Sequence, residues 1–141
     1  MPIKTVDLID LGRTTDNGRK LLMDGPRYHA WLHVYFEPGQ HDELHCHNAD
    51  ETFVCLEGEC TVHFPDGSTS VLKPGTVALI PGGQFYQLEN TGTGRMIMLG
   101  SRGAANAADK TISYETRQQV LYPGQKAGEE RPLPKGTQLY V

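Results

Sequence analysis

Turn-forming residues return at short, nearly even intervals through the middle of this chain, and this spacing limits the possible fold more than any other feature. Between residues 37 and 94, clusters containing Gly, Pro, Asn or Asp separate runs of only five or six residues. The runs are ETFVCL, CTVHF, TSVLK, TVALI, FYQLE and RMIMLG, and most contain β-branched or aromatic residues. Short runs with this punctuation predict an all-β sandwich or barrel.

The rest of the chain divides around this middle part. Residues 28–36, YHAWLHVYF, have little polar alternation and are typical of a strand buried on both faces. We therefore expect a barrel over residues 28–101, preceded by an arm or edge strands over 1–27 and followed by a C-terminal arm or tail over 102–141. That last segment is rich in Gly, Pro, Ala and charge. This composition is compatible with disorder. Alternatively, scattered apolar residues could anchor the segment as an ordered arm on its own barrel or on a partner subunit: Leu121, Tyr122, Leu133, Leu139 and Tyr140.

Charge and length restrict the partners and the location of the protein. With 141 residues and 38% hydrophobic content, the chain can bury one core. The net charge of −4 comes from interspersed signs, so we expect neither nucleic acid nor membrane as a partner. Two aspartates stand in the opening MPIKTVDLID where a signal peptide would be apolar, and no apolar run is long enough to span a bilayer. These features predict a cytoplasmic protein.

A cluster of imidazole and carboxylate side chains follows the first expected strand. His45 and His47 are two residues apart, which places both side chains on one face if this segment is a strand. Glu51 has the same parity and can join that face. Two imidazoles and one carboxylate suit Fe(II), Mn(II), Ni(II) or Zn(II), and they leave coordination positions open for a substrate or for dioxygen. A solvated polar loop is the alternative interpretation.

The spacing of these residues resembles the first sequence motif of the cupin superfamily. Five, one, three and six residues separate, in order, Gly39, His45, His47, Glu51 and Gly58. The frame of the second cupin motif follows with Gly75, Pro81, Gly83 and Asn90. The resemblance covers residues 39–90. It implies a double-stranded β-helix, which is a small jelly-roll barrel, with a divalent transition metal in its mouth and Fe(II) as the favoured ion.

One position departs from the cupin pattern. The second motif usually carries a histidine three residues after its last glycine, and Tyr86 stands at that position. Three residues could fill the fourth ligand position: Tyr86 itself, Gln84 on the same expected strand face, or His41 from the preceding loop. Each also has a simpler interpretation, because Tyr86 could be a pocket wall, Gln84 a turn residue and His41 a solvated loop histidine.

His33 is a further candidate for the pocket. It alternates with other residues on one face of the expected strand over 28–36: His29, Trp31 and Tyr35. If this face points inward, His33 becomes a possible acid–base group near the metal. If the opposite face points inward, His33 lies at the surface or in a subunit contact.

Two functions of different class agree with these features. The first is an enzyme that uses a metal held by His45, His47 and Glu51 to act on a small chelating substrate such as a diketone, a catechol or a hydroxy acid. Dioxygenase-type chemistry is favoured, with Tyr86 and His33 as catalytic candidates, and isomerase, cyclase or lyase chemistry is the next choice. The second is a cupin that binds a metal or small ligand without turnover. In either case we expect a homodimer, because two-fold dimers are the commonest homo-oligomers.

Overall fold

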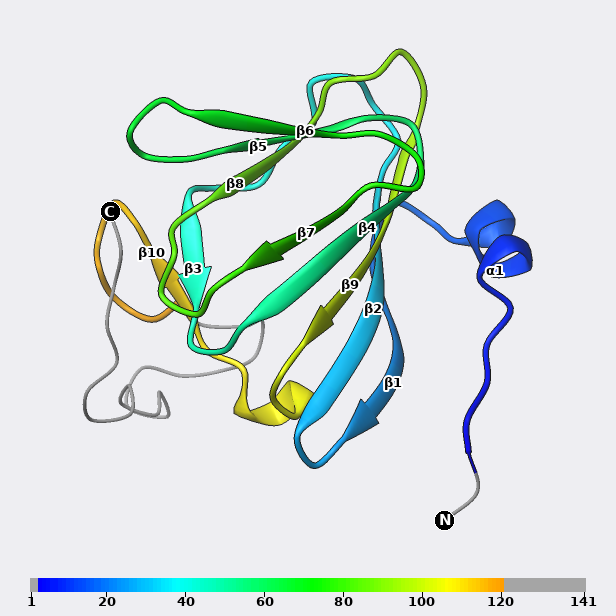
Figure 1. The fold of residues 1–141 in the computed structure, drawn as a ribbon, viewed down its shortest axis with the longest axis horizontal. Helices are drawn as coiled ribbons and strands as arrows, with labels where there is room; N and C mark the ends of the chain where they lie inside the picture. Colours follow the sequence, from blue (N-terminus) through cyan, green and yellow to red (C-terminus); the bar gives the residue numbers. More distant parts are fainter. Residues whose placement is uncertain (1–2, 121–141) are drawn as a thin grey trace.

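Strands dominate the part of the chain that the structure describes, residues 3–120 of a computed structural model (Figure 1). One helix, α1 (Leu8–Thr14), precedes the strands, and a single 3-10 turn, η1 (Asn106–Ala108), lies between the last two. The strands are β1 (Gly18–Gly25), β2 (Tyr28–Tyr35), β3 (His45–His47), β4 (Glu51–Glu57), β5 (Cys60–His63), β6 (Thr69–Leu72), β7 (Val77–Ile80), β8 (Gln87–Asn90), β9 (Met96–Arg102) and β10 (Thr111–Ser113). The predicted all-β class is confirmed, and the N-terminal arm adds a short helix to it.

The strands form one large sheet and two small ones, all with antiparallel pairing. The large sheet has the order β1-β2-β9-β4-β7. Across the barrel from it lie the sheet β6-β5-β8 and the pair β10-β3 (Figure 1). Neighbours in the large sheet are distant in sequence, because β9 lies between β2 and β4. This crossing of antiparallel strands is the jelly-roll arrangement that the cupin resemblance implied, and it agrees with the sandwich or barrel that the turn spacing predicted.

The inner and outer faces of the large sheet differ in what they pack against. On β2, His29, Trp31, His33 and Tyr35 face inward, and Trp31 and Tyr35 belong to the main core with Phe53. The alternate residues Leu32 and Val34 face outward, and both are fully buried. Burial on both faces explains why this strand reads as an almost continuous apolar run.

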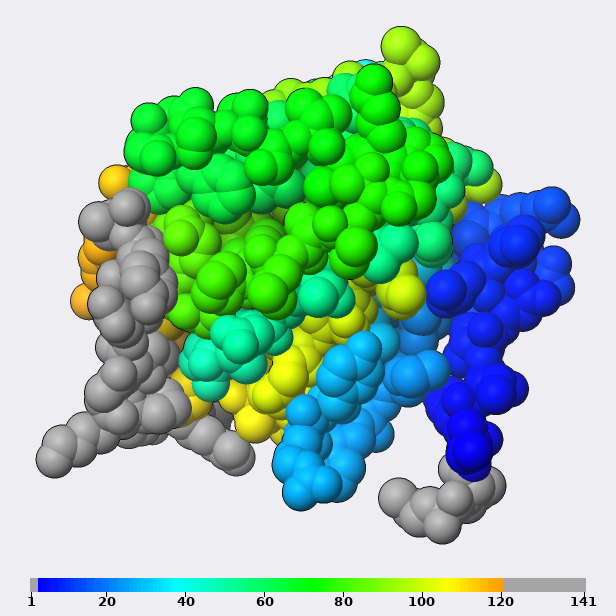
Figure 2. Space-filling view, in the orientation of Figure 1, coloured from blue at the N-terminus to red at the C-terminus, as the bar shows by residue number. Residues whose placement is uncertain are grey.

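The N-terminal segment covers the outer face of β2 and β9. Asp7 caps α1, because its side chain accepts hydrogen bonds from the backbone N–H groups of Ile9 and Asp10 at 3.0 and 3.1 Å. Leu8 and Leu11 then pack against a second apolar cluster, formed by Leu22, Leu32, Val34 and Ile97. In Figure 2 this segment, in dark blue, lies along one side of the barrel. Within residues 3–120, no helix has the length and apolar character needed to cross a bilayer.

Gly58, the last residue of the first motif, has a structural reason to be glycine. Its φ is +78°, in the left-handed region, and a Cβ atom there would lie 2.4 Å from the carbonyl oxygen of Arg95. The glycine therefore allows the turn after β4 to pass close to the backbone that precedes β9. The motif position is required by the fold rather than by the chemistry of the site.

The segment after the barrel strands contributes to the barrel as far as the structure describes it. β9 ends at Arg102, and β10 then pairs with β3 so that Thr111 lies opposite His47. Ile112 of β10 is fully buried with Cys46 and Phe85. The expected anchors Leu121, Tyr122, Leu133, Leu139 and Tyr140 lie outside the described residues.

Candidate functional site

The two histidines of the first motif lie on β3, and both side chains point to the same side of the strand, as their spacing predicted. The ring centroids of His45 and His47 are 4.9 Å apart, with the ring planes at 90°. Both side chains line a cavity of about 880 Å³ at the mouth of the barrel. Cys46, between them, faces the opposite way into an apolar cluster. The short strand therefore sorts its three side chains by parity.

Each of these rings uses Nδ1 to bind the protein. His45 Nδ1 lies 2.6 Å from the carbonyl oxygen of Glu43, and His47 Nδ1 lies 2.9 Å from Asp109 Oδ1. A carbonyl or a carboxylate can only accept, so Nδ1 carries the proton in both rings. Nε2 is then an acceptor with a free lone pair, and no hydrogen bond from the described residues reaches it in either ring. A carbonyl or carboxylate that binds Nδ1 fixes the orientation of the ring, and such partners are typical of histidines whose Nε2 serves a functional site.

Both imidazoles are held in the neutral form. Burial lowers the pKa of His47 to about 3, although the hydrogen bond with Asp109 acts in the opposite direction. Burial also lowers the pKa of His45, opposed by the hydrogen bond with the Glu43 carbonyl. The positive charge of Arg102 lowers both pKa values further. Two uncharged imidazoles with basic lone pairs therefore face the cavity at neutral pH.

Glu51 lies at the start of β4 on the inner face, but a guanidinium already binds it. Arg102 is its direct neighbour across the β4–β9 pair. Arg102 Nε and Nη2 donate to Glu51 Oε2 at 3.0 and 2.6 Å, and both side chains are almost fully buried. Burial raises the pKa of Glu51, and the charge of Arg102 acts against that rise. The carboxylate is thus satisfied by the protein itself.

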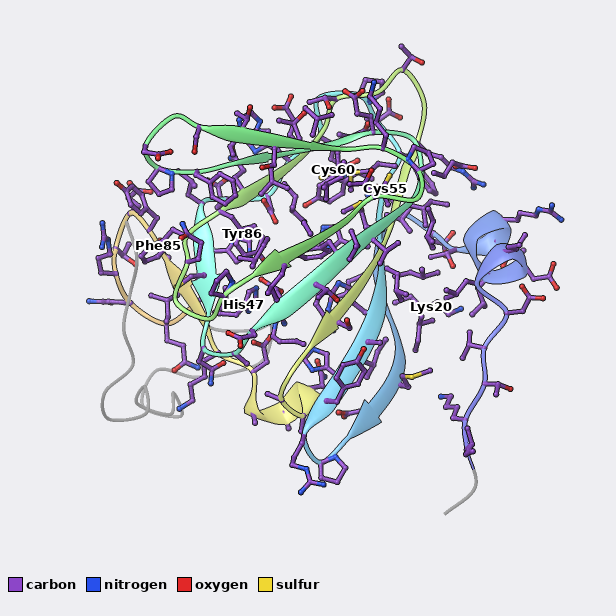
Figure 3. The ribbon with its side chains drawn as sticks, in the orientation of Figure 1. Lys20, His47, Cys55, Cys60, Phe85 and Tyr86 are labelled. Carbon is purple, nitrogen blue, oxygen red and sulfur yellow. The ribbon has the colours of Figure 1, made fainter. Side chains whose placement is uncertain are left out.

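Tyr86 stands beside the two histidines, at the position where the family pattern places a histidine. It forms a β-bridge with His45, and the two ring centroids are 4.5 Å apart. Its hydroxyl lies close enough to the Glu51 carboxylate for each group to influence the pKa of the other. Burial, and then the charge of Glu51, raise the pKa of Tyr86 well above its ordinary value, so the phenol stays protonated. Figure 3 shows Tyr86 and His47 inside the barrel, whereas Phe85 lies toward its side.

Asp109 joins the two halves of this cluster. It accepts from His47 through Oδ1 and from Arg102 Nη1 through Oδ2, the second at 2.6 Å. Burial by itself would raise the pKa of Asp109. The hydrogen bond from His47 and the positive charge of Arg102 outweigh it, and the pKa falls to about 2. A continuous buried network therefore runs from Glu51 through Arg102 and Asp109 to His47.

The cavity has an aromatic wall on the β2 side. Trp31 and Phe53 form an edge-to-face pair at 5.7 Å, and Arg102 lies 4.5 Å over the Trp31 ring. A Cβ atom on Gly100 would lie 2.4 Å from the Trp31 ring, so the glycine makes room for the tryptophan. Aromatic rings, rather than charges alone, determine the shape of this wall.

His33 lies on the inward face of β2 and lines the cavity, as the first of its two interpretations required. Its Nδ1 accepts from Trp31 Nε1 at a long 3.4 Å, and its buried Nε2 has no hydrogen-bond partner among the described residues. Burial lowers the pKa of His33 to about 4. The ring is therefore neutral and close to the site, and its catalytic role remains a prediction.

The two other candidates for the fourth ligand position lie elsewhere. Gln84 contacts its neighbour Phe85, where its amide nitrogen donates to the carbonyl oxygen at 3.0 Å, and it lines a separate small hollow with Phe64 and Pro65. His41 Nδ1 lies 2.8 Å from the Asp42 carbonyl and 3.2 Å from Gln87 Nε2. Neither residue lines the cavity. The structure thus brings Tyr86, but not Gln84 or His41, to the histidines.

These residues do not fit the predicted centre of two histidines and one carboxylate. Among residues 3–120, no three His, Cys, Asp or Glu side chains are arranged so that they could hold a metal ion. His45 and His47 have suitable lone pairs, but Arg102 takes up the carboxylate of Glu51. Two protein ligands are fewer than the three or four that zinc sites use. The metal role of His45, His47 and Glu51 remains a prediction.

Sequence reasoning missed Arg102 and Asp109. Both lie in the segment expected to be a tail, whose content of Gly, Pro, Ala and charged residues gives no sign of a site. A weak signal exists for Arg102, because it continues the inward parity of Met96, Met98 and Gly100 on β9. Asp109 lies in irregular backbone after η1, where no periodicity applies.

Solved structures of other proteins have the same fold as this chain. The fold is similar to an uncharacterized conserved protein with a double-stranded β-helix domain from Klebsiella pneumoniae, with a TM-score of 0.63 at 20% identity over 77% of this chain and 96% of that one. It is also similar to a cupin-2 domain containing protein from Shewanella frigidimarina, with a TM-score of 0.58 at 18% identity over 68% and 91% of the two chains. At these identities the likeness shows the fold alone.

The family follows from the sequence match. Residues 32–100 match the model of the cupin domain family Cupin_2. The uncharacterized protein YdbB of Bacillus subtilis is 41% identical over 49 residues, which are 35% of this chain and 43% of that protein. Residues 32–100 thus match the cupin domain in sequence, and the double-stranded β-helix fold supports the assignment of the chain to the cupin superfamily.

Proposed function

We propose that this cupin binds a small hydroxylated organic molecule in the mouth of its barrel, where His45 and His47 accept hydrogen bonds from it. One observation carries the proposal: two neutral imidazoles line a cavity of about 880 Å³, and each keeps its Nε2 lone pair after Nδ1 has bound the protein. A cavity of this size matches those that hold small ligands. A ligand that binds to such an Nε2 lone pair must carry a hydrogen-bond donor, such as a hydroxyl group.

The surroundings of the histidines define the ligand class further. The rings of His45 and His47 are 4.9 Å apart, so hydroxyl groups on neighbouring carbons could each find one nitrogen. The apolar part of the cavity wall is formed by Trp31, Phe53 and Leu88. This wall favours a ligand with a flat or unsaturated carbon skeleton. Catechols, enolised diketones and hydroxy acids have this combination of paired oxygens and a small skeleton.

A metal-dependent enzyme is the second candidate, and one observation favours it. The hydrogen bond from His47 to the Asp109 carboxylate is the pattern that supports metal-binding histidines in many sites. In this alternative a divalent ion, with Fe(II) favoured and Mn(II), Ni(II) or Zn(II) next, would act on the same chelating substrates by dioxygenase-type, isomerase, cyclase or lyase chemistry. A sensory cupin without turnover would need only the first proposal.

Ligand binding with and without metal separates these functions. We would measure binding of catechol, a β-diketone and a 2-hydroxy acid by calorimetry, first to protein treated with EDTA and then to protein supplied with Fe(II) or Mn(II). Under the first proposal the EDTA-treated protein binds one of the three compounds. His45→Ala then weakens that binding by about tenfold, because one hydrogen bond contributes about 1.4 kcal/mol or less.

The matched control is His63→Ala, because His63 pairs with Glu89 on β5 and β8 and lies outside the cavity. That variant should bind the compound like the original protein. Binding that requires an added metal, together with dioxygen uptake, would support the second candidate instead. The predicted cytoplasmic location and the predicted lack of nucleic-acid and membrane partners remain predictions.

A further inference from the structure

The Glu51 carboxylate, which the family resemblance assigns to a metal, lies against the buried guanidinium of Arg102. We propose that Arg102 takes the place of a metal ion in this cupin: its guanidinium gives Glu51 the positive partner that the family resemblance assigns to a metal. Tyr86, at the position of the missing histidine, lies beside His45 and close to the same carboxylate. This inference concerns the metal alone and does not depend on which ligand the cavity binds.

The geometry of Arg102 is the first support. Arg102 and Glu51 are direct neighbours on the inner face of β9 and β4, so the strand register places them together. Two guanidinium nitrogens reach Glu51 Oε2, at 3.0 and 2.6 Å, and a third reaches Asp109 Oδ2 at 2.6 Å. The side chains of all three residues are less than 5% exposed. Charge-assisted hydrogen bonds from one guanidinium to two buried carboxylates are strong, and they fix the geometry of all three groups.

The second support is that aromatic contacts hold the Arg102 side chain in its position. Its guanidinium lies 4.5 Å over the Trp31 ring, and Gly100 leaves the space in which that ring lies. His29 stacks on Trp31 at 5.2 Å. Arg102 therefore has aromatic contacts as well as two ion pairs to lose if it moves away from Glu51.

The third support is the cost of bringing in a metal. An ion that took Glu51 as a ligand would have to displace the guanidinium, which leaves the positive charge of Arg102 with fewer partners in a buried place. It would also lie next to that positive charge. His45 and His47 would remain as ligands, but two imidazoles bind a divalent ion more weakly than three or four protein ligands do.

Cobalt titration tests the inference, since Co²⁺ reports binding by calorimetry and by its visible absorption. The proteins are purified with EDTA, and the original chain is compared with the double variant Arg102→Met, Tyr86→His. The double variant frees Glu51 and restores the histidine of the motif. We expect it to bind one Co²⁺ at least about tenfold more tightly than the original chain, since changes next to metal ligands alter affinity by about 10–100-fold. Equal affinity in the two proteins would overturn the inference.

Two further variants keep the test decisive. Arg95→Met removes an arginine that pairs with Glu57 on the exposed side of the same strand pair, and it should leave Co²⁺ affinity unchanged. Glu51→Gln covers the case in which the double variant does not fold, as judged by circular dichroism. In the original chain this change should alter Co²⁺ affinity by less than about twofold, because Glu51 is not a ligand. A loss of about tenfold would show that Glu51 binds the metal and would overturn the inference.

Discussion

His47 and Asp109 lie 62 residues apart in the sequence, and yet His47 Nδ1 donates to Asp109 Oδ1 at 2.9 Å inside the barrel. The bond joins the first cupin motif to the segment that follows the last strand of the large sheet. It orients the His47 ring so that Nε2 is left for a ligand, and it fixes which nitrogen carries the proton. Four predictions follow from this site and its surroundings.

Asp109→Asn should destabilise the protein by about 3 kcal/mol. The amide cannot balance the charge of Arg102, and removal of one partner of a buried ion pair costs about 3–5 kcal/mol. We expect the low end of that range because Glu51 still pairs with Arg102. Urea denaturation measures the change. Glu57→Gln is the matched control, since it breaks the exposed pair with Arg95 and should cost less than about 1 kcal/mol.

His33→Leu should make stability less sensitive to acid. The pKa of His33 is lowered to about 4 in the folded protein from 6.5 when unfolded. Between these values the unfolded chain binds a proton that the folded chain does not, so the stability from a neutral His33 is complete above pH 6.5 and falls as the pH is lowered toward 4. Removal of the imidazole should reduce the slope by about 1.4 kcal/mol per pH unit.

Denaturation curves at several pH values between 7 and 4.5 check this prediction. At pH 7 the variant should be less stable by about 1 kcal/mol, because Trp31 Nε1 loses its acceptor at 3.4 Å, while removal of a buried Nε2 without a partner among the described residues acts in the opposite direction. If the unfolding free energy of the variant and of the original protein changed equally with pH, the folded protein would bind a proton at His33 in the same pH range as the unfolded chain, and the prediction would be wrong.

Tyr86→Phe should leave bound metal unchanged and cost about 1 kcal/mol of stability. The phenol is buried and protonated, and its pKa is raised well above the ordinary value, which makes it a poor ligand for a divalent ion. The cost comes from the loss of a buried polar group beside the Glu51 carboxylate. Protein exposed to Fe³⁺ should accordingly lack the absorption band of an iron phenolate. A coloured ferric protein that Tyr86→Phe turns colourless would assign Tyr86 as a ligand.

The chain should form a homodimer through the uncovered part of the large sheet. Val77 and Leu79 on the edge strand β7 point outward and are 62 and 67% exposed, whereas α1 covers the outer face of β2 and β9. Light scattering should return twice the chain mass of 15.6 kDa. Leu79→Glu should shift the protein toward the monomer. A mass of 15.6 kDa for the original chain at micromolar concentration would contradict the prediction.

The sequence predicted most of the barrel but only half of the site. Strand boundaries followed from turns, and the parity of His45, His47 and Glu51 placed all three on the inner face. Gln84 was misplaced beside the cavity because parity holds only within a strand. It lies in a turn that its own N–H closes by bonding the Pro81 carbonyl, and β8 begins at Gln87. Arg102 and Asp109 were beyond reach, because only the folded register brings them to the motif.

The pairing of β10 with β3 has a practical consequence for any shortened version of this protein. The family match stops at residue 100, and a gene cut there would encode both motifs. It would omit Arg102, Asp109 and the strand that lies opposite His47. Such a fragment would keep the sequence by which a cupin is recognised and yet lose the carboxylate that orients His47 and the guanidinium that binds Glu51. A shortened protein meant to keep this site must therefore extend past residue 100, to the end of β10 at least.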